Sequence, residues 1–229
     1  MNTALRYNKL NSLLENVFYP DLTRTLSKRG ICMFNFKKGC KVPFPEKIFE
    51  EYEITEYGYI ANISVEKTID VLKDFVNLQD GLVFFFLELP ANLSDEPKKD
   101  TVTNSHKDIY YMDGLTKEET FSFLDSVGEL LANDGLCKFG FGSQNNSDEI
   151  MVGKYNVVTI LCKKTNPYGN LLHRNNIKRA EHLVTAWDTF SEEATGTSEK
   201  IELNGKDVYS IIDDFKNWGI YFAKRIINE

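Results

Sequence analysis

The chain has 229 residues, of which 42% are hydrophobic, and it carries a formal net charge of −7. This composition is typical of a globular protein that can bury a core without disulfides or metal ions, and it excludes a disordered chain. A negative charge repels phosphate backbones and anionic lipid, so neither nucleic acid nor a membrane is expected as a partner. A basic protein, in contrast, would be attracted.

The expected compartment is the cytoplasm. The cysteines Cys32, Cys40, Cys137 and Cys162 form no C-x-x-C pair, and a Cys32–Cys40 disulfide is geometrically allowed but not expected. The N-terminus lacks the apolar centre of a signal peptide, and no apolar run has the length of a membrane span. The simplest interpretation of these features is a cytosolic protein whose cysteines are reduced.

In chain order, residues 4–18 have the apolar spacing of an amphipathic helix, which Pro20 ends. Ser64 is a favourable N-cap for a second helix. Residues 82–89 are almost wholly apolar, which is typical of a strand buried on both faces. The elements expected around them are strands at 31–36 and 57–63, loops at 39–45 and 90–107, and a strand at 108–112.

The third helix begins with a capping box, because Thr116 is followed by Glu119 three residues later. Beyond it, residues 136–164 contain two apolar runs around a polar turn, which predicts a central β-hairpin with a long second strand from Ile150 to Cys162. The remaining expectations are a turn at 166–170, a helix at 176–187 that places Trp187 on its apolar side, a strand at 201–203 and a long helix at 206–227.

These elements predict one α+β domain over residues 1–229. Its sheet is expected to be mixed but mostly antiparallel, built around the hairpin at 136–164, with helices packed on it and a long C-terminal helix. A minor subdivision near residue 165 is the alternative.

No motif assigns a reaction. The Gly140–Gly142 pair does not extend to G-x-G-x-x-G, and there is no P-loop, G-x-S-x-G elbow or H-E-x-x-H pattern. No catalytic residue, metal ligand or cofactor is therefore assigned. Scattered carboxylates are more simply explained as a solvated surface.

The acidic, aromatic stretch before and within the expected strand at 57–63 is the strongest candidate contact surface, because tyrosines are enriched at interface hot spots and carboxylates suit a basic partner. The long polar loop after residue 90 is the second. The residues assigned to the stretch are Phe49, Glu50, Glu51, Tyr52, Glu53 and Tyr57, and those assigned to the loop are Asp95, Glu96 and His106.

Three functions remain open. The first is a non-catalytic protein-binding protein, such as an immunity-type inhibitor of a cognate basic toxin. The second is an enzyme whose site combines Asp148 or Glu149 with His106 or His173. The third is a structural or regulatory homo-oligomer that uses the apolar stripe of the C-terminal segment.

Overall fold

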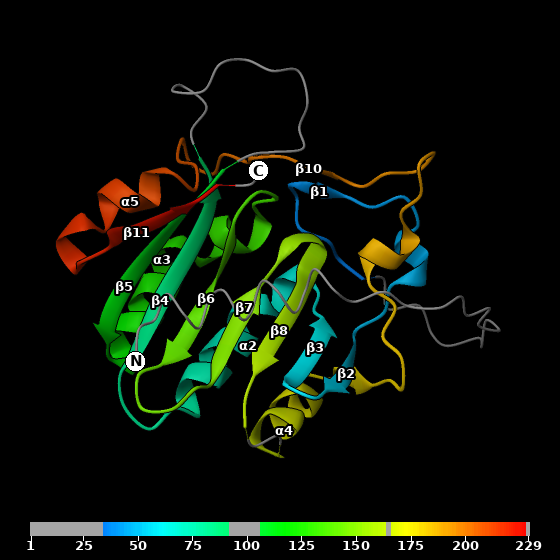
Figure 1. The fold of residues 1–229 in the computed structure, drawn as a ribbon, viewed down its shortest axis with the longest axis horizontal. Coiled ribbons are helices and arrows are strands. Elements are labelled where there is room, and N and C mark those ends of the chain that lie inside the picture. The colour runs from blue at the N-terminus through cyan, green and yellow to red at the C-terminus, as the bar shows by residue number, and fades with distance from the viewer. Residues whose placement is uncertain (1–33, 92–105, 164–165, 228–229) are drawn as a thin grey trace. The chain divides into compact units, whose positions relative to one another are not determined.

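The computed structural model describes residues 34–91, 106–163 and 166–227. These residues form an α+β fold with a large mixed sheet (Figure 1). The expected helix at 4–18, Cys32 and most of the polar loop lie outside the described residues. The extent of the domain over residues 1–229 therefore stays a prediction.

The large sheet consists of β2 (Glu51–Thr55), β3 (Gly58–Asn62), β4 (Val83–Pro90), β5 (Lys107–Leu115), β6 (Lys138–Ser143), β7 (Glu149–Val152), β8 (Val157–Leu161), β9 (Lys178–Arg179) and β11 (Tyr221–Ile226). A separate pair is formed by β1 (Cys40–Lys41) and β10 (Thr197–Ser198). The helices are α2 (Val65–Asn77), α3 (Lys117–Asn133), α4 (Asn166–Arg174) and α5 (Ser210–Asp214). Short 3-10 turns are η1 (Pro45–Lys47), η3 (Lys154–Asn156), η4 (Ala186–Thr189) and η5 (Lys216–Trp218).

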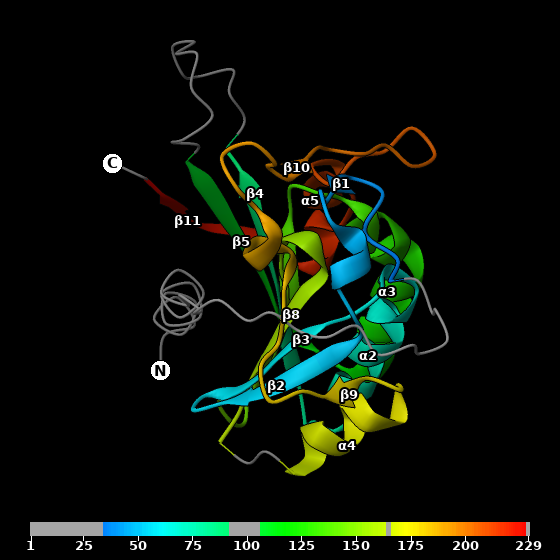
Figure 2. The ribbon, with the colours of Figure 1, turned by 90° about the vertical axis from the view of Figure 1, so that its right-hand side faces the viewer.

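The strand order is β11-β5-β4-β6-β7-β8-β3-β2-β9. Neighbouring strands are antiparallel except β2 and β9, which are parallel, so the predicted mixed, mostly antiparallel sheet is confirmed. Helices α2 and α3 pack on one face of this sheet (Figure 2). Among the described helices, none is long and apolar enough to cross a bilayer.

The two large helices follow the sequence signals closely. In α3 the capping box is confirmed, because the Thr116 hydroxyl accepts from the Glu119 N–H at 3.2 Å and the Glu119 carboxylate accepts from the Thr116 N–H at 2.9 Å. Ser64 does occupy the N-cap of α2, but its hydroxyl accepts from the Asn35 N–H instead of an N–H of its own helix. Strand β4 is buried on both faces, as expected, and Phe85 meets Phe123 of α3 at 4.6 Å between ring centroids.

The central stretch differs from the prediction, because it forms three strands. Strands β6 and β7 pair across the polar turn, but the long second strand from Ile150 to Cys162 is wrong. The chain reverses at Tyr155 and Asn156, both in the left-handed region with φ of 53° and 62°, and β8 then pairs back onto β7. Buried hydrogen bonds offset this strain: Asn156 accepts from the Lys37 N–H and donates to the Ile63 carbonyl.

Five smaller expectations are also corrected. The expected turn at 166–170 lies within α4, where Pro167 suits the first helical turn. The helix expected at 176–187 is wrong, because Asn176 adopts a φ of 59° and sends the chain into β9. Residues 34–36 form no strand, and 39–45 contain β1. In place of a strand at 201–203, Leu203 bridges to Lys206 across the Asn204–Gly205 turn.

The long C-terminal helix at 206–227 is wrong as well. The first apolar residues of that segment, Val208, Ile211 and Phe215, are buried, but α5 ends at Asp214. Gly219 then adopts a φ of 91°, a conformation that glycine tolerates best, and the chain leaves as strand β11. The far end of the predicted stripe, Trp218 and Phe222, is consequently exposed.

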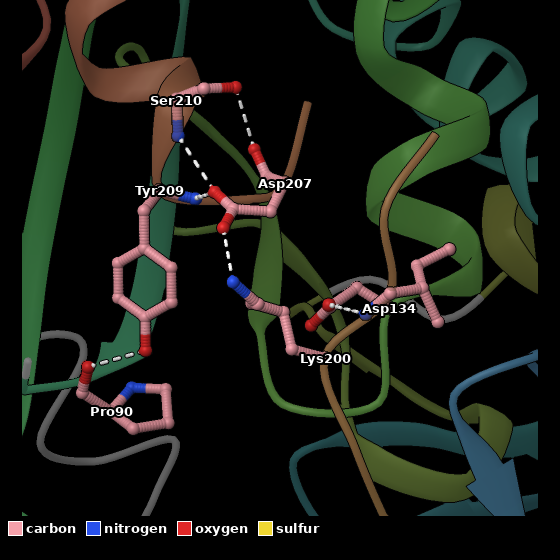
Figure 3. Close-up of polar contacts among 7 residues, drawn as sticks. Pro90, Asp134, Lys200, Asp207, Tyr209 and Ser210 are labelled. Carbon is pink, nitrogen blue, oxygen red and sulfur yellow. Dashed lines mark hydrogen bonds and ion pairs between the residues drawn. The ribbon is translucent and has the colours of Figure 1, made fainter. Parts of the chain in front are cut away.

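Polar contacts fix the segment that leads to α5 (Figure 3). The Asp207 carboxylate binds Lys200 and accepts from the N–H groups of Tyr209 and Ser210 at the start of the helix. The Tyr209 hydroxyl donates to the Pro90 carbonyl at the end of β4, at 3.0 Å. The C-terminal residues are thereby tied to the sheet that they extend.

Candidate protein-binding surface

The predicted acidic, aromatic stretch lies in and around β2, near one end of the strand order. Strand alternation turns Tyr52 into the core, where its ring meets Tyr59 at 5.6 Å. Phe49 precedes the strand and is 50% exposed. Tyr57 lies in the turn between β2 and β3, and a hydrogen bond with the Glu56 side chain raises the pKa of its hydroxyl.

Glutamates of this stretch have partners within the chain. Glu50 forms an ion pair with Lys67 of α2, and both side chains are partly buried. Glu53 accepts from the Leu183 N–H at 2.8 Å. Glu51, whose backbone pairs with Lys178 of β9, is partly exposed. Glu50 and Glu53 therefore hold the chain together locally, and partner binding by the predicted residues stays a prediction.

A second segment, residues 181–193, lies beside the first, as the blue and gold ribbons of Figure 1 show. The buried Asn62 side chain links them, since its amide donates to the Phe49 carbonyl at 3.2 Å and to the Val184 carbonyl at 2.8 Å. Ala186 is fully buried near Cys40, and Val42 packs against the same small cluster. Segments that are more than 120 residues apart in the sequence thus lie side by side.

Trp187 is the principal side chain that the sequence did not reveal. It is 52% exposed, and its ring contacts Tyr155 at 4.7 Å and Phe190 at 5.5 Å, both edge to face. Thr185 and Asp188 form a capping box that starts η4, and this pattern was visible in the sequence. The capping box marks the start of a new helical turn at Ala186, so a single helix cannot run from residue 176 to residue 187.

The two segments also concentrate negative charge. Residues 42–57 and 181–193 together contain nine Asp and Glu residues and one Lys, so their charge of −8 exceeds the −7 of the whole chain. The one lysine, Lys47, places its Nζ 4.3 Å from the centroid of the exposed Phe44 ring. Residues 42–57 and 181–193 are called the Trp187 surface below.

The residues of the enzyme hypothesis are not all brought together. Antiparallel pairing places Pro90 of β4 next to Lys107 and Val83, at the other end of β4, next to Ser143. His106 therefore lies at the opposite end of β4 from the β6–β7 turn that holds Asp148. Asp148 accepts from the Tyr168 hydroxyl at 2.6 Å, and burial and this carboxylate raise the pKa of that hydroxyl. Glu149 is buried.

The described part of the chain includes two hollows whose lining residues bear on the enzyme hypothesis. One, of about 500 Å³, is lined by Leu78, Pro167, Asn170, His173 and Arg174. The other, of about 290 Å³, lies between α5 and the β4–β5 pair and is lined by Leu89, Pro90, Asp108, Tyr110, Tyr209, Ile212 and Asp213. The described side chains include no group of three or more His, Cys, Asp and Glu that could hold a metal ion. Asp95 and Glu96 lie outside the described residues.

No protein-family model, no curated protein and no solved structure matches this chain. Function is therefore inferred from the surface itself.

Proposed function

We infer that this chain is a non-catalytic cytoplasmic protein that binds a basic protein partner through the Trp187 surface. An immunity-type inhibitor of a basic toxin is the specific form that we favour. The observation that carries this proposal is the presence of three exposed aromatic side chains, Phe44, Phe49 and Trp187, on two adjacent segments that hold nine carboxylates and one lysine.

The two components would contribute differently to binding. Exposed aromatic residues bury much area at a small cost in side-chain entropy, which is why tryptophan and tyrosine dominate interface hot spots. Carboxylates at the rim would mainly accelerate encounter with a basic partner and make it sensitive to salt. The Lys47 ammonium group already lies over the Phe44 ring in a cation–π contact. A lysine or arginine of the partner could contact the Phe49 or Trp187 ring in the same manner.

Rigidity supports the same proposal. Tyr155 is buried beneath Trp187, and Phe190 contacts both rings. An aromatic side chain that is already held in place loses little freedom on binding, so more of its burial energy appears as affinity.

A charge-reversal experiment tests the electrostatic part. Glu46, Glu192 and Glu193 are exposed on the Trp187 surface, and we expect their joint replacement by lysine to abolish capture of a basic partner from lysate of the native host. The matched control replaces Asp70, Glu118 and Glu202, which are exposed elsewhere, and alters the net charge equally. Equal capture by both variants would contradict the proposed surface.

A further inference from the structure

Phe44 and Lys47 form a local unit within the Trp187 surface. Phe44 is the N-cap of the 3-10 turn η1, and Lys47 is the last residue of that turn. The Lys47 N–H donates to the Phe44 carbonyl at 3.1 Å. Residues three apart in such a turn lie one above the other, so the two side chains share one face. Ile48, which follows the turn, is 2% exposed and anchors it in the protein.

The Lys47 ammonium group lies on an aromatic ring although its segment is rich in carboxylates. Its Nζ is 4.3 Å from the centroid of the Phe44 ring, and the Phe44 side chain is 37% exposed. Lys47 forms no ion pair with a described carboxylate, and Glu50 of the same segment pairs with Lys67 instead. The Phe44 ring is therefore a cation-binding position that the chain itself fills.

A cation held in this way is readily exchanged, because cation–π contacts at exposed positions are weak. Arginine gains most from the exchange. Its guanidinium group is planar, is less strongly hydrated than an ammonium group and stacks on aromatic faces. Nine carboxylates in residues 42–57 and 181–193 attract a basic protein to this position, and Lys47 is the one lysine among them.

We propose that the Trp187 surface binds an arginine side chain of the basic partner on the Phe44 ring, and that Lys47 occupies the ring until the partner displaces it. This inference rests on the proposed function, since it names the side chain that the surface recognises. Phe44 is then the residue that favours arginine over lysine. Lys47 competes for the same ring and so limits the affinity of the surface.

Two peptides of equal charge, acetylated hexa-arginine amide and acetylated hexa-lysine amide, test the proposal in calorimetric titrations of the full chain at low salt. The wild type should bind hexa-arginine more tightly than hexa-lysine. Phe44→Leu should reduce this preference about threefold, because the site keeps its apolar bulk but loses the ring. Lys47→Ala should bind hexa-arginine about threefold more tightly than the wild type, because the ring is vacant.

Loss of a positive charge alone would also favour a basic peptide, and two controls separate this effect from the vacated ring. Lys41→Ala removes the same charge from an exposed residue just before the surface, and it should give a smaller gain. In a Phe44→Leu background, Lys47→Ala should gain no more than Lys41→Ala does, because no ring remains to be vacated.

The ε-methylene proton resonance of Lys47 reports the displacement itself. The ring current of Phe44 should shift this resonance upfield in the free protein. Saturation with hexa-arginine should return it to the position that it has in Phe44→Leu. A resonance that stays shifted when hexa-arginine is bound would overturn the proposal.

Equal gains for Lys47→Ala and Lys41→Ala, or a preference for arginine that Phe44→Leu leaves unchanged, would overturn it as well. A wild type that binds neither peptide would have the same consequence, whereas the proposed function is judged by capture of a partner from lysate. Binding of hexa-arginine that depends on Glu46, Glu192 and Glu193 but not on Phe44 would remove this inference and leave the proposed function standing.

Discussion

Two regions of the molecule expose aromatic side chains, but they are held in different ways: the Trp187 surface joins two segments that are distant in sequence, whereas β11 lies along β5 at one end of the sheet. At the β2 end, the Lys178 and Ala180 N–H groups donate to the carbonyls of Glu50 and Tyr52, and Glu53 accepts from the Leu183 N–H. At the β11 end, Arg225 donates two hydrogen bonds to Asp108 and the Tyr221 hydroxyl donates to Asp113, and both carboxylates belong to β5. The first region therefore depends on contacts between distant segments, and the second on contacts between neighbouring strands.

Charge separates the two ends further. The Trp187 surface has nine carboxylates and one lysine, whereas β11 carries Lys224 and Arg225 and no acidic residue. The first is therefore suited to a basic partner. The second has no carboxylate to attract a basic protein.

Replacement of Asn62 by leucine should give the largest effect on the β2 end. The change removes both hydrogen bonds to the Phe49 and Val184 carbonyls inside the protein, and unsatisfied buried groups of this kind cost about 2–3 kcal/mol in total. Denaturant unfolding would measure the loss. An unchanged unfolding midpoint would show that the two segments are held together by other contacts.

Replacement of Asp108 by asparagine should weaken the β11 end by a smaller amount. The charged hydrogen bonds to Arg225 would be lost, but the Arg225 side chain is 40% exposed and water can replace part of the interaction. We expect about 1.5 kcal/mol of destabilisation and faster hydrogen exchange in β11 than in β2. Equal exchange rates in the two strands would contradict the assigned role of Asp108.

The Asp207 contact should make stability depend on pH. Burial opposes ionisation, but the ion pair with Lys200 and the N–H groups of Ser210 and Tyr209 outweigh it, so the pKa of Asp207 is lowered. A lowered folded-state pKa stabilises the fold above the pKa of the unfolded carboxyl, near 3.9, and this stabilisation is lost as the pH falls through the folded-state value. Asp207→Asn should cost about 1 kcal/mol at pH 7 and less at pH 2, which lies below the ordinary pKa of the carboxyl group. A cost that is the same at both pH values would exclude this mechanism.

Single replacement of exposed aromatics should have the smallest effect on folding. Phe49→Ser and Trp218→Ser are each expected to change the free energy of unfolding by less than about 0.5 kcal/mol. Thermal unfolding would check both variants. A large loss in either would mean that the side chain stabilises the fold and is unavailable to a partner.

The sequence predicted those parts of the fold that local signals determine. The capping box at Thr116, the apolar spacing of α2 and the doubly buried β4 each depend on neighbouring residues, and the structure contains all three. The predicted C-terminal helix failed because the spacing of Val208, Ile211 and Phe215 fits a helical turn, but Gly219 ends that pattern. Similarly, the reversal at Tyr155 and Asn156 depends on buried partners that are distant in sequence.

The candidate surface was predictable only in part. The acidic, aromatic composition around Phe49 was visible in the sequence, but the burial of Tyr52 and the internal partners of Glu50 and Glu53 were not. Trp187 was missed because the placement of its segment next to residues 42–57 depends on the Asn62 bridge between the Phe49 and Val184 carbonyls. Hydrogen bonds between distant residues determine this surface, and periodicity within one segment does not report them.

The most direct test of the proposed function compares two exposed tryptophans, Trp187 on the proposed surface and Trp218 just before β11. Tagged wild type, Trp187→Ser and Trp218→Ser would be used to capture partners from lysate of the native host at low and high salt, with the captured protein identified by mass spectrometry. We predict one basic partner that is lost with Trp187→Ser and at high salt but retained by Trp218→Ser, corresponding to a loss of at least about 2 kcal/mol of binding free energy at Trp187. Retention of that partner by Trp187→Ser, or the absence of any basic partner, would contradict the proposal.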